Sequence, residues 1–289
     1  LYRLVGSEMC IRDSSKYVIG DIQGCYKEFK NLIKLIDPNK ENKFLCVGDL
    51  VNRGPESEKV VDYVIKNNVK SVFGNHDLHL MAILIGARKH NKKKDTMQKL
   101  INKNKAIEII DYFSQFSFAK VVSSNKKKSL IVHAGVLPSW SLDNILSAND
   151  ELQEDLKKDP EEFFSTMYSD RSKAISKSTN KKNRRRYLIN VFTRMRFISE
   201  KNKLDLQTKL KKAGSNKFNP WFSYKHKCLK DVDNIIFGHW AALNGVTNHN
   251  NIKGIDLGCV WGGSLAAINI EDKSIICLLY TSDAADDVE

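Results

Sequence analysis

The chain lacks any long hydrophobic run. No apolar stretch in its 289 residues approaches the roughly 20 residues that cross a bilayer. No basic segment followed by an apolar run and small residues marks a secretion signal. We therefore expect a soluble cytoplasmic protein with no membrane partner.

Cysteine is sparse and its spacing is uninformative. None of the six cysteines lies in a CxxC pair, and only Cys25, Cys46, Cys228 and Cys259 lie away from the chain ends. Scattered thiols of this kind predict a reducing compartment, with neither a zinc site nor a disulfide framework.

The two ends of the chain resemble translated adapter DNA. Residues 9–13 (MCIRD) and 277–282 (CLLYTS) can be encoded by the two strands of one inverted repeat. We therefore treat 1–14 and 278–289 as non-native segments and leave them out of the fold prediction. Residues 15–277 are expected to form a single domain.

Basic residues outnumber acidic residues. The formal net charge is +13, and it rises to about +17 without the four acidic residues of 278–289. This balance favours polyanionic partners such as nucleotides, RNA or phosphates. A lysine-rich and asparagine-rich proteome explains it equally well. With 42% hydrophobic residues the chain can bury a substantial core.

Apolar stretches at 16–20, 43–47 and 70–73 predict short buried strands, each followed by a polar turn that contains glycine. Apolar residues at helical spacing lie between them, so the chain begins as a βαβαβ unit. Such alternation predicts a parallel or mixed sheet with function at the carboxyl ends of its strands.

Further strand candidates at 116–122, 129–132, 234–237, 252–255 and 264–271 predict a second, more antiparallel sheet. Residues 85–112 and 141–230 are charged and predict cap insertions of helical or irregular structure. Within the first insertion, the run at 91–95 (NKKKD) is expected to be exposed. The fold class is therefore α/β, a four-layer arrangement in which two packed mixed sheets are flanked by helices.

Potential metal ligands follow several of these strands. The contexts GDIQG, GDLVNRG, GNHD, VHAG and GHW supply Asp21, Asp49, Asn75, His76, His133 and His239. One such turn alone usually forms a turn or caps a helix. Repeated oxygen and imidazole ligands at one sheet edge are what a two-metal centre requires.

These motifs resemble those of the calcineurin-like metallophosphoesterases, and of their phosphoprotein-phosphatase branch in particular. GDIQGCYKE, GDLVNRGP, FGNHDLHL, FTRMRF, NPWF, FGHWA and DLGCVWGGSL resemble, more narrowly, the symmetrical bis(5′-nucleosyl)-tetraphosphatases, or diadenosine tetraphosphatases. The resemblance implies metal-dependent hydrolysis of diadenosine tetraphosphate to two ADP. Other dinucleoside polyphosphates and nucleoside-polyphosphate RNA caps are further substrates that this activity would include.

The resemblance also implies a role for each motif residue. The metal ligands would be Asp21 at the first ion, Asp49 between both ions, and Asn75, His133 and His239 at the second. A bridging carboxylate allows two dications to lie about 3.5 to 4 Å apart and to acidify a shared water. The implied ions are Mn²⁺ first, with Co²⁺ or Mg²⁺ as alternatives.

Two positions depart from the wider family. Gln23 stands where that family has a metal-binding histidine, so the first ion is expected to be bound through Gln23, through water, or only loosely. A harder amide ligand predicts a preference for Mn²⁺ or Mg²⁺ over softer ions. Asn52 stands where protein phosphatases have an aspartate that supports the catalytic histidine. A neutral amide does not raise the histidine pKa as a carboxylate does. This position fits cleavage of an anhydride better than cleavage of phosphoserine.

The catalytic residues implied by the resemblance are His76, Asp77 and Arg53. His76 would protonate the leaving oxygen and Arg53 would neutralise charge on the phosphoryl group. Arg194 and Arg196 in FTRMRF are predicted to bind the polyphosphate, with surface solubility as the alternative for either one.

Five further residues have two interpretations each. Asp256 supports the metal site from behind its ligands or forms a turn. Trp221, Phe222, Trp240 and Trp261 stack on nucleobases or, more commonly for such residues, pack in the core.

Two other functions remain open at this point. One is a protein serine/threonine phosphatase with the same centre. The other is a basic RNA-binding protein whose metal site has decayed at Gln23, which salt-dependent RNA binding without hydrolysis would indicate. No obligate protein partner is expected.

Overall fold

The computed structural model describes residues 16–39, 42–101, 103–124, 127–168 and 179–280. The expected non-native segment 1–14 and most of 278–289 lie outside these residues. Leu278 and Leu279 are described, and they end a strand that pairs with the first sheet.

The first sheet is mixed and has the strand order β11-β12-β1-β2-β3, with β13 paired to β12. Strands β1, β2 and β3 are parallel, as the βαβαβ pattern predicts, whereas β12 is antiparallel to β1. The bounds are β1 Lys16–Ile19, β2 Lys43–Cys46, β3 Lys70–Ser71, β11 Asp256–Leu257, β12 Ser264–Asn269 and β13 Ile275–Leu279. The intervening helices are α1 Tyr26–Ile36 and α2 Ser57–Lys66.

The second sheet has the order β10-β9-β5-β4. Its strands are β4 Ala119–Ser124, β5 Lys127–Val132, β9 Asn234–Phe237 and β10 Ile252–Gly254. The prediction of a more antiparallel sheet is wrong, because β9 pairs in parallel with both β5 and β10 and only β4 is antiparallel. The candidate at 264–271 was also assigned to the wrong sheet, since β12 pairs with β1. Strand polarity depends on how the long connections cross over, which local patterns do not record.

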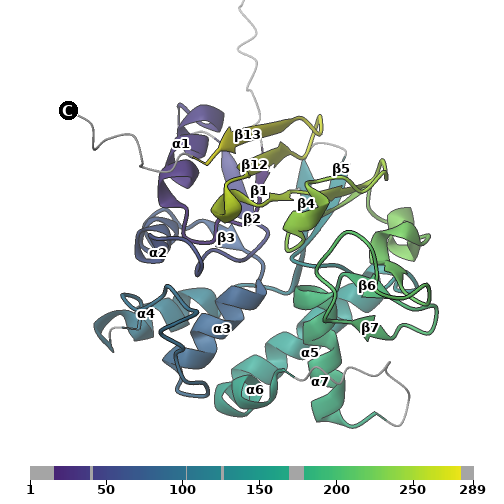
Figure 1. Cartoon of the computed structure of the whole chain (residues 1–289), viewed down its shortest axis with the longest axis horizontal. Helices are drawn as coiled ribbons and strands as arrows, with labels where there is room; N and C mark the ends of the chain where they lie inside the picture. Colours follow the sequence, from purple (N-terminus) through teal and green to yellow (C-terminus); the bar gives the residue numbers. More distant parts are fainter. Residues whose placement is uncertain (1–15, 40–41, 102, 125–126, 169–178, 281–289) are drawn as a thin grey trace, which may run out of the picture.

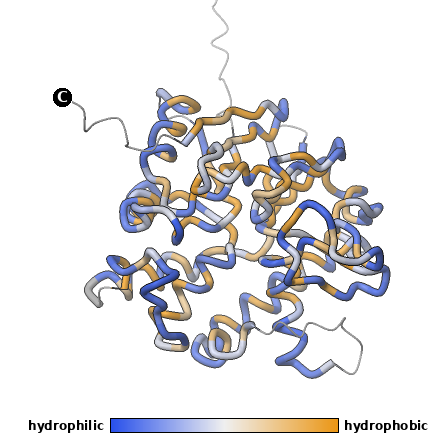
Figure 2. Tube along the Cα trace, in the orientation of Figure 1, coloured by the Kyte–Doolittle hydropathy of each residue, from blue (hydrophilic) through white to orange (hydrophobic). Residues whose placement is uncertain are grey.

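Alternate residues of the strands fill the space between the two sheets. Val18 and Leu45 from the first sheet pack in one buried cluster with Ile131 and Ile236 from the second. Each buried aliphatic side chain of this kind contributes roughly 1.5 to 3 kcal/mol. The hydrophobic colouring in Figure 2 follows the strands and gives way to hydrophilic residues in the loops. This packing holds the carboxyl ends of both sets of parallel strands next to each other.

The cap lies beside these strand ends (Figure 1). Helix α3 Asn75–Leu84 leads into it, and its own helices are α4 Lys103–Phe113, α5 Leu142–Lys158, α6 Pro160–Thr166 and α7 Lys181–Arg194. A small antiparallel sheet joins β6 Phe197–Ile198 to β7 Leu204–Asp205 and β8 Asn219–Pro220. The short 3₁₀ helices are η1 Trp221–Ser223, η2 Lys227–Lys230, η3 Ala241–Leu243 and η4 Cys259–Trp261. In the part of the chain that the structure describes, no helix has the length and apolar character needed to span a membrane.

Candidate metal centre and its flanking cavities

The predicted metal ligands occupy loops at the carboxyl ends of strands from both sheets. Asp21, Asp49 and Asn75 follow β1, β2 and β3, and His133 and His239 follow β5 and β9. Because β1 to β3 are mutually parallel, and β5 is parallel to β9, the loops of each sheet emerge at one edge. The packing of the sheets then brings the two edges together.

Four of these side chains meet at one point. The ligand atoms of Asp49, His133 and His239 lie within 4.8 Å of one another. Oδ1 of Asp49 lies 3.5 Å from Nε2 of His133, and Oδ1 of Asn75 lies 3.4 Å from the same nitrogen. His133 is fully buried and Asp49 nearly so. The structure therefore gathers an aspartate, an amide and two imidazoles that are separated by up to 190 positions in the chain.

The histidines of this cluster are neutral. Burial lowers the pKa of both His133 and His239. Nδ1 of His133 donates to the carbonyl oxygen of Val47 at 2.8 Å, so Nε2 presents a lone pair toward Asp49. The amide of Asn75 turns its oxygen toward these rings, although the reverse orientation would let its nitrogen donate to Nδ1 of His239 at 3.0 Å. A cation between them would stabilise the oxygen-inward orientation, because an imidazole lone pair and an amide oxygen otherwise repel each other.

Asp21 lies beside this cluster, and the loop that carries His239 holds its carboxylate in place. The backbone N–H of His239 donates to both carboxylate oxygens of Asp21 at 3.1 Å. A Cβ at Gly238 would lie only 1.9 Å from Oδ1 of Asp21, so this position needs glycine. Burial, and then the neighbouring Asp256 and Asp49, raise the pKa of Asp21 well above its usual value. Three buried carboxylates whose negative charges repel one another favour a bound cation that neutralises them.

Asp256 contributes to this concentration of negative charge. It is the first residue of β11 and is buried, and one of its oxygens accepts the backbone N–H of Gly258 at 3.0 Å. Burial raises its pKa to about 6. The carboxylate thus both forms a turn and lines the cavity at the metal centre, so the two predicted roles are compatible.

Backbone strain is concentrated around the centre. Five non-glycine residues there have left-handed φ angles, a conformation that costs of the order of 1 to 3 kcal/mol per residue. They are Gln23 at 46°, Asp49 at 51°, Asn52 at 76°, Arg53 at 68° and His239 at 64°. Each belongs to a motif of the sequence analysis, so the fold holds these side chains at the expense of local stability.

A cavity of about 390 Å³ opens directly onto the cluster. Arg53, Arg194 and Arg196 line it, together with Trp240 and Trp261. Nη2 of Arg196 donates to the carbonyl oxygen of His239 at 3.2 Å, and burial lowers the pKa of Arg196 to about 10, which leaves it cationic at neutral pH. Helix α7 ends at Arg194 and the chain continues extended, so both arginines reach the same cavity.

The aromatic residues divide between core and cavity. Trp221 and Phe222 are buried core residues. Trp240 is also buried, although it is among the residues that line the cavity, whereas Trp261 lines the same cavity and is 68% exposed. Of these four aromatic residues, only Trp261 therefore presents a ring face that a nucleobase can cover.

His76 is linked to the first cap insertion by a chain of hydrogen bonds. Nδ2 of Asn52 donates to Nδ1 of His76 at 3.0 Å and contacts Oδ1 of Asp95 at 3.2 Å. Oδ2 of Asp95 in turn lies 3.1 Å from Nε2 of His79. The Asn52 oxygen accepts backbone N–H groups, including that of Thr96 at 3.1 Å, so the amide orientation is determined. Asn52 therefore makes Nδ1 of His76 an acceptor and leaves the proton on Nε2, which lies 3.9 Å from Asp49.

Asp95 is a residue that the sequence analysis missed. It ends the NKKKD run, whose first four residues are exposed as predicted. Its own side chain is only 6% exposed. The one signal in the sequence is that Asp95 is the only acidic residue of a basic run.

A model of the calcineurin-like phosphoesterase family matches residues 16–257. The chain belongs to this family. The predicted resemblance and the predicted fold class are thus confirmed. Divalent metal ions are the cofactors of calcineurin-like phosphoesterases, and the Asp49, His133 and His239 cluster of this chain is a candidate site for them.

Three curated relatives carry the name bis(5′-nucleosyl)-tetraphosphatase, symmetrical. The protein of Cellvibrio japonicus is 39% identical and covers 90% of this chain and 97% of its own length. The proteins of Marinomonas sp. and Legionella pneumophila are 37% and 38% identical, and each alignment covers 89% of this chain and 94% of the relative. At this identity and coverage the chain is a member of their family.

Two solved structures share the fold. One is provisionally described as a diadenosine tetraphosphatase and has a TM-score of 0.60 at 21% identity, covering 94% of this chain and 96% of its own. The other is a protein serine/threonine phosphatase from Saccharomyces cerevisiae, with a TM-score of 0.53 at 14% identity and coverage of 96% and 82%. At these identities the similarity concerns the phosphoesterase fold alone.

Gln23 lies at the phosphoesterase centre. Its amide nitrogen is 3.4 Å from Oδ2 of Asp49, and the side chain lines the cavity. A rotation of the amide would present its oxygen to the same point. The position is therefore suited to an oxygen ligand for a first ion beside Asp21.

Asp77 does not reach the cavity. It is fully buried and its carboxylate accepts the backbone N–H groups of Asp49 at 2.8 Å, Leu50 at 2.9 Å and Gly74 at 2.9 Å. These bonds fix the loop that carries Asp49 against the start of α3. The predicted catalytic role of Asp77 is therefore better described as positioning, because its oxygens are all directed at the backbone.

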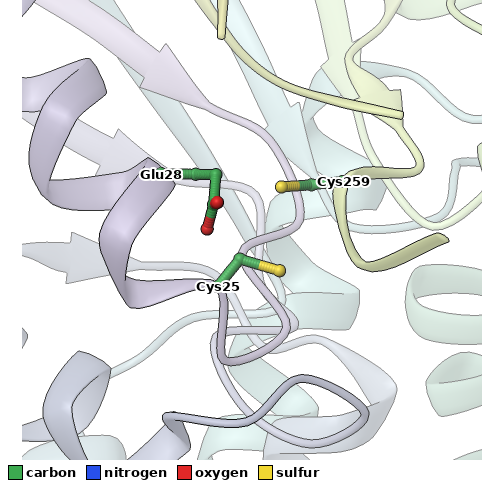
Figure 3. A group of neighbouring side chains, drawn as sticks. All are labelled: Cys25, Glu28 and Cys259. Atoms are coloured by element: carbon green, nitrogen blue, oxygen red, sulfur yellow. The ribbon is translucent and has the colours of Figure 1, made fainter. Parts of the chain in front are cut away.

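A second polar cluster lies near Gln23 (Figure 3). Cys25, Glu28 and Cys259 point toward one another, with ligand atoms within 4.8 Å, and all three are buried. A hydrogen bond with Cys25, and then burial, raise the pKa of Cys259, so its thiol stays protonated. The cysteine spacing gave no sign of this pairing, since the two thiols are 234 positions apart.

Proposed function

We propose that this chain is a metal-dependent hydrolase that cleaves diadenosine tetraphosphate symmetrically into two molecules of ADP. The observation that carries the proposal is the convergence of Asp49, Asn75, His133 and His239 beside an arginine-lined cavity. The identity of the substrate is supported by the names of relatives that are 34–39% identical over about nine-tenths of the chain.

Two divalent cations fit the chemistry of the donor set. The residues that would hold them are Asp21 and Gln23 for the first, Asp49 for both, and Asn75, His133 and His239 for the second. A bound pair would acidify water and neutralise phosphoryl charge. Oxygen and imidazole donors favour Mn²⁺, with Co²⁺ or Mg²⁺ as alternatives.

The protein side chains supply binding and hydrogen bonding. Arg53, Arg194 and Arg196 hold the phosphoryl oxygens, and guanidinium groups match their geometry. Water adds to phosphorus while the bond from phosphorus to the bridging oxygen breaks, and the electron pair stays on that oxygen. The neutral ring of His76 donates a hydrogen bond from Nε2 to the leaving oxygen, which departs as an ADP anion, and the proton that the water loses passes to solvent.

Asn52 explains why an anhydride suits this site. A carboxylate at this position would raise the pKa of His76 and make the protonated form more available. The amide of Asn52 supports the neutral ring instead. A nucleoside diphosphate is a much weaker base than a serine alkoxide and needs less help to leave. Asn52 therefore supports cleavage of a polyphosphate over that of a phosphoserine.

Product analysis tests the proposal. Metal-stripped protein is incubated with diadenosine tetraphosphate, single ions are added back, and the nucleotides are resolved. ADP alone, formed only after an ion is added, is the expected result. ATP with AMP would show attack at another phosphorus, and no product with any ion would overturn the hydrolase proposal.

Capped RNA is a second substrate within the same proposal, because a nucleoside-polyphosphate cap contains the same anhydride bonds and the basic chain attracts RNA. Release of ADP from a capped transcript tests it. A phosphopeptide assay tests the serine/threonine phosphatase alternative, and salt-dependent RNA binding without hydrolysis tests the RNA-binding alternative. The scattered cysteines support a cytoplasmic location as part of this proposal, and cell fractionation tests that location.

A further inference from the structure

A second cavity adjoins the first on the side of the cap. It has a volume of about 520 Å³ and shares Arg53, Asn75, His76 and Arg194 with the cavity at the metal centre. Asp21 does not line it, and Asp256 and Gln23 line only the first cavity. His76 therefore lies on the boundary between a cavity that Asp49 and His239 line and a second cavity that neither of them lines.

Tyr168 organises two arginines in this second cavity. The guanidinium carbon of Arg88 lies 5.2 Å from the centre of the Tyr168 ring, and that of Arg194 lies 5.0 Å from it. The Tyr168 hydroxyl donates to the backbone oxygen of Asn75 at 3.2 Å, which ties the ring to the metal-binding loop. Cation–π contacts of this kind restrict the guanidinium groups and leave their edges available for an anion.

The second cavity is strongly basic. Arg53, Arg88, Lys94 and Arg194 line it, against the single carboxylate of Asp95. That carboxylate already accepts hydrogen bonds from Asn52 and His79. Nε of Arg88 is buried and has no hydrogen-bond partner among the residues that the structure describes. Cations arranged without sufficient counter-charge, with an unpaired donor among them, fit a phosphorylated ligand.

We propose that the second cavity binds the diphosphate of the leaving nucleoside, with Arg88 and Tyr168 as residues that determine specificity for a diphosphate leaving group. The proposal rests on the proposed function. In-line displacement puts the leaving oxygen opposite the attacking water. The water enters from the side of Asp49 and His133, so the leaving oxygen departs past His76 into the space lined by Arg88. The attacked half of the substrate remains in the first cavity, where Trp261 is exposed.

The symmetric cut follows from this arrangement. When Nε2 of His76 donates a hydrogen bond to the bridging oxygen, the phosphates on the far side of that oxygen must lie within reach of Arg53, Arg88 and Arg194. Two phosphates followed by a nucleoside fill such a cavity, and the other half of a tetraphosphate then also carries two.

The decisive variant is Arg88→Gln, with Lys89→Gln as the matched control. Lys89 is the next residue, is exposed, and lines neither cavity, so both variants remove one positive charge from the same segment. We compare kcat/KM for diadenosine tetraphosphate with kcat/KM for a p-nitrophenyl phosphate ester, whose leaving group carries no phosphate. Arg88→Gln is expected to lower the former about 10- to 100-fold and to change the latter less than about 2-fold. Lys89→Gln is expected to match the wild type on both substrates.

A second pair of variants separates the ring from the hydroxyl. Tyr168→Phe keeps the surface on which Arg88 and Arg194 rest, whereas Tyr168→Leu removes it. Only Tyr168→Leu is expected to reproduce the substrate-selective loss of Arg88→Gln. Equal losses on both substrates would show that these residues act through the metal centre or the fold, and would overturn the proposal. Full activity of Arg88→Gln on the tetraphosphate would overturn it as well.

Binding of ADP tests the second cavity independently of whether the protein hydrolyses diadenosine tetraphosphate. Calorimetric titration of metal-free protein with ADP is expected to give an affinity about 10-fold weaker in Arg88→Gln than in Lys89→Gln. If the wild type fails to hydrolyse diadenosine tetraphosphate but Arg88→Gln still binds ADP more weakly than Lys89→Gln, the cavity is a diphosphate site in an enzyme that acts on another substrate. Equal ADP affinity in the two variants would refute the site.

Discussion

The side-chain amide of Asn52 donates to Nδ1 of His76 at 3.0 Å, and the same amide nitrogen contacts Asp95 at 3.2 Å. Asp95, a residue of the first cap insertion, thereby orients the side-chain amide of Asn52, and this amide in turn orients His76. In the protein phosphatases that the motifs resemble, a carboxylate lies directly beside this histidine. Here the carboxylate is one residue further away, so it can orient the histidine without acting on it as a direct partner.

We expect Asp95→Ala to lower kcat for diadenosine tetraphosphate about 10-fold and to leave KM nearly unchanged. The substrate does not need to contact Asp95, whereas the proton on Nε2 of His76 depends on the orientation of Asn52. Steady-state kinetics measure the effect. Lys93→Ala, a change at an exposed neighbour, serves as the control.

A double-mutant cycle tests whether Asp95 acts through Asn52. In an Asn52→Ala background the further change Asp95→Ala is expected to have little effect, because the intermediate link is already absent. If the two losses simply add, the hydrogen-bonded chain does not couple these residues.

Gly238→Ala is expected to abolish metal-dependent activity while the fold survives. The added Cβ would lie 1.9 Å from Oδ1 of Asp21 and 2.6 Å from Cγ2 of Val47. Asp21 must then leave its position, and we expect activity to fall more than about 100-fold. Titration calorimetry with Mn²⁺ is expected to show weaker binding. Gly214→Ala is the control, since the nearest atom to its Cβ lies at 3.7 Å; near-normal Mn²⁺ affinity in Gly238→Ala would contradict the assignment of Asp21.

Gln23→His is expected to change the order in which ions restore activity. An imidazole in place of the amide at this position favours borderline ions such as Co²⁺ over Mg²⁺. Activity of metal-stripped protein with single added ions measures the order. Gln115→His, on the exposed surface, should behave as the wild type. An unchanged order of ions in Gln23→His would show that residue 23 does not contact a metal.

His226 predicts a pH dependence of stability away from the metal centre. Burial lowers its pKa from 6.5 to about 4 while its Nε2 bonds the carbonyl oxygen of Trp221 at 3.1 Å. The unfolded chain takes up the proton first, so this contribution to stability is complete above pH 6.5 and is lost as the pH falls toward 4. The slope reaches at most about 1.4 kcal/mol per pH unit.

Urea unfolding at several pH values measures this slope. His226→Gln is expected to remove the part of the acid destabilisation that lies between pH 6.5 and 4, because the glutamine does not titrate. The comparison between the two proteins cancels the opposite contributions of the buried carboxylates. Identical pH profiles for the wild type and the variant would contradict a buried neutral His226.

The strand-end residues of the candidate site could be located from the sequence because their signals are local. Short apolar stretches followed by glycine-containing turns indicate where β1, β2, β5 and β9 end, and the ligand types follow directly. The helical spacing of Phe29, Leu32, Ile33 and Ile36 likewise predicts the buried face of α1, which the structure shows. Each of these features extends over fewer than about 15 residues, so the chain itself displays it.

The tertiary structure alone decided which distant segments touch. The sequence around Asp95 does not predict its hydrogen bond with Asn52, and the sequence around Tyr168 does not predict its contact with Arg88. Strand β12 joins the first sheet and Cys259 meets Cys25 for the same reason. Such contacts depend on how long connections cross over and on how the cap closes against the sheets. Their free energy comes from packing many residues together, so no short stretch of sequence carries a record of it.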